Sequence, residues 1–199
     1  MKNILFGFAI TATTLTACNN SNNKVAENLP ATNDTVQVKP PADTSIPTAA
    51  EVKNIISIKE IITAYLQLKN AFTKDNTNDA AAAGTSLQTA FKNFDKTALT
   101  EPQKKVFDDV ADDAGEHAEH IGKNGGNIVH QREHFIMLSK DLADLIKTFG
   151  NGGQTLYKDF CPMANDGKGA TWISETKDIK NPYLGKAMPT CGTVKEEMK

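Results

Sequence analysis

Apolar residues recur every three or four positions through most of the chain between Ile55 and Gly150. This spacing places apolar side chains on one face of a helix, where they can be buried together. Four such stripes predict four helices. They consist of Ile58, Ile61, Tyr65, Leu68 and Phe72; of Ala80, Ala83, Leu87, Ala90 and Phe94; of Val106, Val110, Ala114, His117 and Ile121; and of Ile128, Gln131, Phe135, Leu138, Leu142, Leu145 and Phe149.

The breaks between the stripes are short and carry the signals of helix ends. Residues 75–79 are mostly polar and predict a turn. The run Thr100-Glu101-Pro102-Gln103 is a capping box with proline in the first helical turn, and it predicts the start of the third helix. Residues 122–126 hold three glycines and separate the third helix from the fourth. Because short connections make successive helices antiparallel, the pattern predicts an all-α fold, a four-helix up-down bundle.

After Gly152 and Gly153 the helical periodicity stops. The rest of the chain is rich in glycine, proline and asparagine, and it predicts an irregular C-terminal cap that packs on the bundle. We therefore expect one folded domain over residues 55–199.

The chain begins with the pattern of a secretory signal, in which Lys2 precedes an apolar run over residues 4–10. The sequence Leu15-Thr16-Ala17-Cys18 is similar to the lipobox of bacterial lipoproteins. This likeness implies that residues 1–17 are a lipoprotein signal peptide and that Cys18 is lipidated. Because asparagine rather than aspartate follows Cys18, we expect an outer-membrane lipoprotein that faces the periplasm. An ordinary signal peptide with an incidental cysteine is the alternative.

Residues 18–54 have the composition of a tether. Four of the eight prolines of the chain fall there, and no aromatic residue occurs between Phe8 and Tyr65. Such a segment lacks the apolar side chains that form a core. We predict a lipidated cysteine followed by a disordered tether that sets the folded domain off the membrane.

Charge and aromatic content narrow the classes of function. The 22 Lys and Arg residues nearly balance the 24 Asp and Glu residues, and no run of basic residues occurs. Aromatic residues make up only 7% of the chain. A nucleic-acid-binding protein usually carries a basic patch, and base stacking needs several exposed rings. We therefore expect no nucleic-acid partner.

The four histidines of the chain all lie between His117 and His134. In a helical hairpin that turns near residues 124–125, His120 and His130 are almost equidistant from the turn, and His117 and His134 lie about one helical turn further away. The spacings of three and four residues also place two imidazoles on one face of each helix, as a Zn(II) or Cu(II) site requires. Histidines that are simply solvated at the tip of the hairpin are the alternative.

His130, Glu133 and His134 also match the inverted zinc-protease pattern His-x-x-Glu-His, in which two histidines bind zinc and the glutamate activates water. A zinc hydrolase of this kind needs a third ligand from another helix and a substrate cleft. Because the predicted helix is a core element of a small bundle, we expect no enzyme. A di-iron carboxylate site is excluded, since no glutamate precedes a histidine by three residues.

Cys161 and Cys191 each have a methionine close by, Met163 and Met188. Thiolate and thioether sulfurs are soft ligands that favour Cu(I), and two such pairs could surround one copper ion. Outside the cytoplasm, two cysteines also commonly form a disulfide. The residues alone leave both outcomes open.

Several motifs of the predicted domain occur together in one known family. They are Tyr65-Leu66-Gln67-Leu68-Lys69, Gln131-Arg132-Glu133-His134-Phe135, Phe160-Cys161-Pro162-Met163-Ala164, Lys168-Gly169-Ala170-Thr171-Trp172-Ile173-Ser174, residues 179–188 and Cys191-Gly192. In their order and spacing the chain resembles, from about Ile58 to Val194, an uncharacterised extracytoplasmic domain-of-unknown-function family. That family occurs in bacterial lipoproteins and fused to CusB-type copper efflux adaptors. The resemblance implies copper handling in the periplasm, and it implies as ligands Cys161, Met163, Met188 and Cys191, with His134 next.

Together these features predict a periplasmic lipoprotein that binds Cu(I) or a similar soft metal ion and buffers it or hands it to a metal efflux adaptor. Copper is the expected cofactor, with zinc as the alternative. The candidate ligands are Cys161, Met163, Met188, Cys191, His134, His130, His120 and His117. The rival hypothesis is a structural or interaction module that docks on a transporter without metal and is closed by a Cys161–Cys191 disulfide.

Overall fold

The computed structural model describes residues 57–199. The predicted signal peptide, the lipidation site at Cys18 and the tether of residues 18–54 lie outside the described residues. Within the described part, no helix has the length and apolar character needed to cross a membrane.

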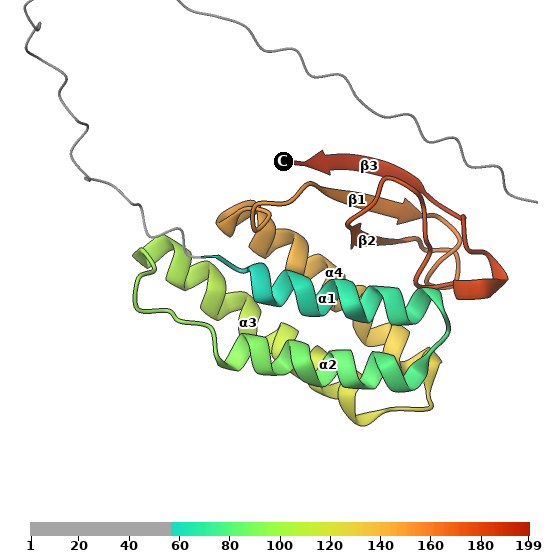
Figure 1. The fold of residues 1–199 in the computed structure, drawn as a ribbon, viewed down its shortest axis with the longest axis horizontal. Helices are drawn as coiled ribbons and strands as arrows, with labels where there is room; N and C mark the ends of the chain where they lie inside the picture. The colour runs from blue at the N-terminus through green and yellow to red at the C-terminus, as the bar shows by residue number, and fades with distance from the viewer. Residues whose placement is uncertain (1–56) are drawn as a thin grey trace, which may run out of the picture. The chain divides into compact units, whose positions relative to one another are not determined.

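Four helices come first in the described chain, and they confirm the helical part of the prediction (Figure 1). Their bounds are α1 Lys59–Thr73, α2 Thr77–Lys92, α3 Glu101–Lys123 and α4 Ile128–Phe149. Each helix packs against the next one along the chain, and successive helices run in opposite directions. The apolar stripes meet in a common core, where the ring centroids of Tyr65 and Phe135 lie 5.1 Å apart.

The polar breaks end the helices as their sequence predicts. The Thr100 hydroxyl accepts a hydrogen bond from the Gln103 amide, and the Gln103 side chain accepts one from the Thr100 amide, which completes the capping box of α3. Asn76 and Asn127 cap α2 and α4 through their side-chain oxygens. Gly150 follows α4 with a positive φ of 83°, a conformation that suits glycine. Local sequence therefore sets where α2, α3 and α4 begin and where α4 ends.

The helices α2 and α3 approach closely at two glycines. A side-chain carbon at Gly84 would lie 2.9 Å from the carbonyl oxygen of Ala118 and 2.9 Å from the amide nitrogen of Gly122. Both atoms belong to the backbone of α3, so they cannot move aside without moving the helix. The thin, alanine-rich stripe of α2 therefore lets the two helices pack backbone to backbone.

We expect Gly84→Ala to lower the free energy of unfolding by about 2 kcal/mol, because the added methyl group pushes α2 away from α3. Gly115→Ala is the matched control on α3. Apart from the adjoining backbone of α3 itself, no atom of residues 57–199 lies within 4 Å of the position of its new carbon, so the higher helix propensity of alanine should raise stability by about 0.5–1 kcal/mol. Urea unfolding of both variants measures the changes. Equal effects of the two substitutions would contradict the close approach.

The C-terminal part is not the irregular cap that the sequence predicts. It forms a three-stranded antiparallel sheet in the order β2-β1-β3, so the fold is mixed, α then β, rather than all-α. The elements are β1 Leu156–Cys161, β2 Ala170–Ser174, the short 3-10 helix η1 Gly185–Ala187 and β3 Thr193–Met198. The prediction is wrong here because the strands are only five or six residues long and β3 is largely exposed, which removes the apolar alternation of a half-buried strand.

Strand β2 packs against α4 and α1 and joins the sheet to the helices (Figure 1). Trp172 of β2 is fully buried in this interface. The Tyr65 hydroxyl of α1 accepts a hydrogen bond from the Ile173 amide at 3.1 Å and lies 2.7 Å from the Ser139 hydroxyl oxygen of α4. This tyrosine therefore connects two helices and a strand and fixes the sheet on α1 and α4.

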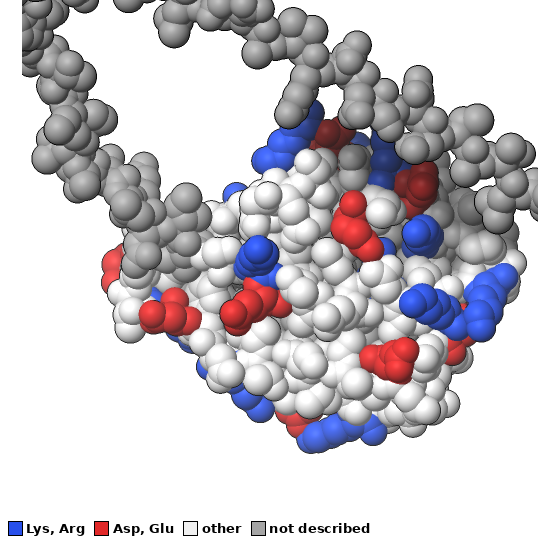
Figure 2. Space-filling view, in the orientation of Figure 1, with Lys and Arg blue, Asp and Glu red and all other residues white. Residues whose placement is uncertain are grey.

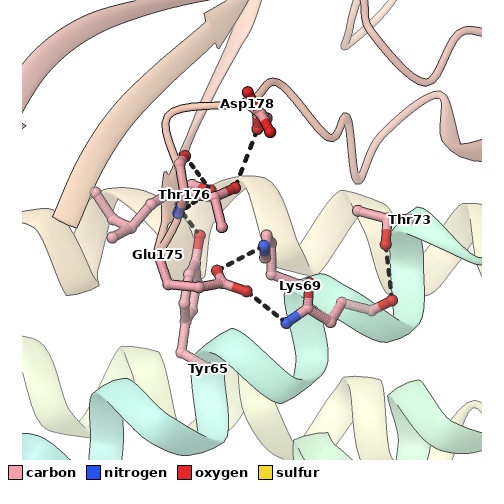
Figure 3. A network of polar contacts seen from close by, with 9 residues as sticks. Tyr65, Lys69, Thr73, Glu175, Thr176 and Asp178 are labelled. Atoms are coloured by element: carbon pink, nitrogen blue, oxygen red, sulfur yellow. Dashed lines mark hydrogen bonds and ion pairs between the residues drawn. The ribbon is translucent and has the colours of Figure 1, made fainter. Parts of the chain in front are cut away.

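A buried ion pair lies at the same interface (Figure 3). The Lys69 ammonium of α1 donates a hydrogen bond of 2.7 Å to the carboxylate of Glu175, the residue after β2. Asn70 donates a second hydrogen bond, of 2.8 Å, to the same carboxylate. Asp159 of β1 is also fully buried, and neither of its carboxylate oxygens has a hydrogen-bond partner among residues 57–199. Three ionisable groups therefore lie close together between the sheet and the helices.

Candidate functional site

The turn between α3 and α4 brings together the four histidines, as their nearly equal distances from the turn predict. His117 and His120 lie in the last two turns of α3, and His130 and His134 in the first two turns of α4. At the start of α4, the side chain of Asn127 accepts a hydrogen bond from the His130 amide. The tight hairpin and its polar caps therefore position all four imidazoles on one seam between the two helices.

Three of these histidines are close enough to share a metal ion. One ring nitrogen of each of His120, His130 and His134 lies within 4.8 Å of the chosen nitrogens of the other two. The rings of His120 and His134 are stacked with centroids 4.4 Å apart, and the His130 ring stands edge-on to His134 at 4.6 Å. A transition-metal ion binds imidazole nitrogen at about 2.0–2.1 Å, so the three rings need to draw together only slightly to bind one ion.

His117 takes a different place from the other three. Its Nδ1 lies 3.1 Å from the Nδ1 of His134, so one ring donates a hydrogen bond to the other. With His134 as the donor, its Nδ1 carries the proton and its unprotonated Nε2 can bind a metal ion. Contacts of this kind orient a metal-binding imidazole and fix its tautomer. His117 is therefore a positioning residue for the candidate ligand His134.

Two glutamates stand beside the other candidate ligands. A Glu133 oxygen lies 3.4 Å from Nδ1 of His130, and a Glu116 oxygen lies 3.6 Å from Nε2 of His120. A carboxylate next to a ligand histidine orients the ring and makes it a stronger donor. Glu116 is missing from the sequence-based set of site residues, although its spacing of four residues from His120 on one helix face is the signal that could have found it.

The surroundings favour the neutral, metal-binding form of two of the histidines. Burial lowers the pKa of His117. Burial also lowers the pKa of His134, and repulsion from the neighbouring histidines in their protonated form adds to this effect. A proton and a metal ion compete for the same ring nitrogen. The lowered pKa therefore keeps His134 available for a metal ion at pH values where an ordinary histidine is already protonated.

The cluster also bears on the zinc-protease pattern at His130, Glu133 and His134. His120 of α3 provides the third ligand that such a site needs. The Glu133 side chain, however, is largely exposed and lies at ion-pair distance from the ring of His130. A glutamate that activates a metal-bound water has to lie within hydrogen-bond reach of that water. Glu133 therefore lies beside a candidate metal ligand, His130.

Cys161 and Cys191 are brought together as well. Cys161 ends β1 and is fully buried, whereas Cys191 precedes β3 and is partly exposed. Their sulfur atoms lie 2.7 Å apart. The hydrogen bond between the two thiols raises the pKa of Cys191 above its ordinary value. The sequence could not show this proximity, because the two residues are 30 positions apart in the chain.

The two methionines lie at the surface beside this thiol pair. The Met188 carbonyl accepts a hydrogen bond from the Cys191 amide, and the Met163 amide donates one to the Cys191 sulfur. Met163 is 54% exposed and Met188 is 38% exposed. The main chain of both residues therefore contacts Cys191, while their side chains are accessible to solvent.

Part of the chain matches a known protein family. The match covers residues 61–154, and the family is described as "Protein of unknown function (DUF3347)". The matched region holds nearly all of the four helices and the whole histidine cluster, whereas Cys161 and Cys191 lie beyond it. No curated protein and no solved structure matches the chain. The chain therefore contains a DUF3347 domain of unknown function at residues 61–154.

Proposed function

We propose that the chain is a lipid-anchored protein of the periplasm that binds a copper ion and buffers it or hands it to an efflux system. The observation that carries this proposal is the cluster of His120, His130 and His134, whose ring nitrogens converge to within 4.8 Å of one another. Imidazole is a common ligand of copper and zinc, and a given set of donors generally binds Cu(II) more tightly than Zn(II). Copper is therefore the expected ion, with zinc as its competitor.

The exposure of the cluster supports exchange of the ion rather than permanent storage. The His120 side chain is 44% exposed, and the His130 side chain is 34% exposed. Three protein ligands also leave a coordination position open for water or for a donor group of a partner. An ion held in this way can pass to a partner without unfolding of the α3–α4 hairpin.

The sulfur residues support a second candidate, the binding of Cu(I) by the reduced protein. Cys161 and Cys191 present adjacent thiols, and Met163 and Met188 add exposed thioethers close to them in the chain. Soft donors of this type favour Cu(I). The rival hypothesis of a docking module without metal uses the same two sulfurs for a disulfide, and metal titration distinguishes the two.

The proposed location and partner rest on sequence features. Leu15-Thr16-Ala17-Cys18, with its likeness to a lipobox, supports an outer-membrane anchor with the domain in the periplasm. The resemblance to a family that is also fused to CusB-type adaptors supports a copper efflux adaptor as the partner. Acidic and basic side chains are interspersed over the face shown in Figure 2. No turnover is proposed.

Titration of the full chain with Cu(II) against a competing chelator tests the proposal. We expect wild type to bind one ion at the cluster. The double variant His130→Gln/His134→Gln should bind it at least about 100-fold more weakly, since loss of even a supporting residue at a metal site typically lowers affinity by about 10–100-fold. The same titration with Zn(II) should show weaker binding than with Cu(II).

The double variant Lys105→Gln/Lys147→Gln is the matched control for this experiment. It changes one exposed side chain on α3 and one on α4, both away from the histidines in sequence. Its affinity for Cu(II) should equal that of wild type, and circular dichroism should show the same helix content in all three proteins. Unchanged affinity in the histidine variant would refute the site.

A further inference from the structure

The thiol pair of Cys161 and Cys191 is held in place by the surrounding backbone and not only by its own sulfur contact. Cys161 is fixed in the sheet as the last residue of β1, opposite Ala170 of β2. Cys191 is held by Asn181, a fully buried residue whose side-chain amide donates a hydrogen bond of 2.6 Å to the Cys191 carbonyl. The Asn181 amide donates another, of 2.8 Å, to Pro189 in the same segment. Both cysteines are therefore positioned before any covalent bond forms between them.

The two sulfurs are placed to react one after the other with the disulfide of another molecule. They lie 2.7 Å apart, and a disulfide bond requires about 2.05 Å, so a small movement of either side chain joins them. Cys191 is the partly exposed member, and its sulfur is the one that an oxidant reaches first. Cys161 is fully buried directly behind it and can displace the oxidant from the mixed disulfide.

We infer that Cys161 and Cys191 form a reversible redox site whose dithiol form binds Cu(I) and whose disulfide form does not. Oxidation breaks two S–H bonds and forms one S–S bond. The two electrons and two protons pass to the disulfide of an extracytoplasmic thiol oxidant, which is reduced to two thiols. The inference deepens the proposed copper binding and rests on it for its role in the cell, but its chemistry does not involve the histidine cluster.

The ligands available at this site select the metal. Among residues 57–199, neither cysteine belongs to a group of three His, Cys, Asp or Glu ligand atoms within coordinating distance. Structural zinc sites take four protein ligands and iron–sulfur clusters usually take four cysteines, so neither fits this pair. Two thiolates, with the exposed thioethers of Met163 and Met188 close by in the chain, suit the soft ion Cu(I).

Oxidation removes this site because the thiolate, and not the sulfur of a disulfide, is the metal ligand. The imidazoles of the α3–α4 hairpin are unaffected by the same reaction. The chain therefore carries a histidine site whose ability to bind metal is independent of the redox state of its surroundings. It also carries a cysteine site whose ability to bind metal depends on that state.

The test compares wild-type full-length protein after oxidation with oxidised glutathione and after reduction with dithiothreitol, with both reagents then removed under anaerobic conditions. Alkylation followed by peptide mapping reports the state of each cysteine, and titration with Cu(I) against a chromophoric chelator reports the ions bound. We expect a Cys161–Cys191 cross-link in the oxidised sample and two alkylated cysteines at these positions in the reduced sample. The reduced sample should bind one more Cu(I) per chain.

Two variants separate this site from the histidine cluster. Cys191→Ser should abolish the difference in Cu(I) binding between the two samples, whereas His130→Gln/His134→Gln should keep the difference even if it binds no Cu(II). The comparison on wild type needs no substitution, so poor folding of a variant cannot hide the result. If both cysteines stay open to alkylation after oxidation, or if both wild-type samples bind equal amounts of Cu(I), the inference is wrong.

Discussion

Replacing Glu175 by glutamine should lower the free energy of unfolding by about 3 kcal/mol, whereas replacing Lys69 by methionine should lower it by less than about 1 kcal/mol. The two residues form the buried ion pair of Figure 3, with 2.7 Å between Lys69 Nζ and Glu175 Oε2. The asymmetry follows from their exposure, because the Lys69 side chain is 0% exposed and the Glu175 side chain is 31% exposed. Loss of the carboxylate leaves an ammonium ion buried without its counter-ion. Loss of the ammonium leaves a carboxylate that water still reaches.

The pKa values of Lys69 and Glu175 reflect the same opposition between desolvation and mutual attraction. Desolvation lowers the pKa of Lys69 despite the attraction of Glu175. Desolvation of Glu175 acts to raise its pKa, but the hydrogen bonds from Lys69 and Asn70 outweigh this effect and hold the pKa of Glu175 below its usual range. The charge of the buried lysine therefore depends on the carboxylate.

Urea unfolding of the two single variants and of Lys69→Met/Glu175→Gln measures these effects. The double variant should be close in stability to Lys69→Met alone, since without the ammonium of Lys69 the loss of the Glu175 carboxylate leaves no buried charge unpaired. For a domain of this size, a loss of about 3 kcal/mol corresponds to a fall of roughly 10 °C in melting temperature. Equal losses in the two single variants would show that the pair behaves as an ordinary surface ion pair.

Replacing Asp159 by asparagine should raise the free energy of unfolding relative to wild type. This gain should be about 2–3 kcal/mol larger at pH 8 than at pH 5. Burial raises the pKa of Asp159 from 3.8 to about 7. Attraction to Lys69 lowers this pKa by more than repulsion from Glu175 raises it, but both effects are smaller than that of burial. Between pH 5 and about pH 7 the folded protein keeps on Asp159 a proton that the unfolded chain has already released. The free energy of unfolding of wild type therefore falls as the pH rises through this window, and asparagine, which does not titrate, removes this fall.

Unfolding curves of wild type and Asp159→Asn at several pH values in this range provide the measurement. The difference between the two proteins isolates Asp159, because other titrating groups, such as His117 and His134, contribute equally to both. Asp178→Asn is the matched control, since this aspartate is exposed and its substitution should change stability by less than about 0.5 kcal/mol at every pH. A difference that stays constant with pH for Asp159→Asn would contradict the raised pKa.

The helices could be predicted from the sequence because their signals are local. The capping box at Thr100 and the glycines of residues 122–126 act within a few residues of the helix ends that they define. Ala114 and Ile121 of the predicted α3 stripe are fully buried, but at the start of this helix Phe107 is buried in place of Val106, which is only partly buried. The Phe107 ring stacks on Phe94 at 4.2 Å, and Phe94, which its spacing places in the predicted second helix, lies just beyond the end of α2 at Lys92.

One candidate site could likewise be predicted from the sequence, and the other could not. The histidines could be predicted to meet because a hairpin is symmetric about its turn, and His120 and His130 flank that turn directly. The contact between the cysteines depends on the pairing of the sheet and on the segment held by Asn181, neither of which has a local signal. The burial of Asp159 runs against the rule that charged residues stay exposed, so only the packing of the sheet on the helices reveals it.

The order of the strands also sets the order in which the domain can fold. The middle strand β1 has as neighbours β2, which follows after a short turn, and β3, which follows only after the long connection through η1. Helices and the β1–β2 hairpin form through contacts close in sequence, whereas docking of β3 has to await closure of a long loop. Until then β1 presents an open edge of unpaired amides and carbonyls, to which a strand of another molecule can add. A Cys161–Cys191 bond formed early would hold the start of β3 beside the end of β1, and it would shorten the time during which newly made chains can aggregate.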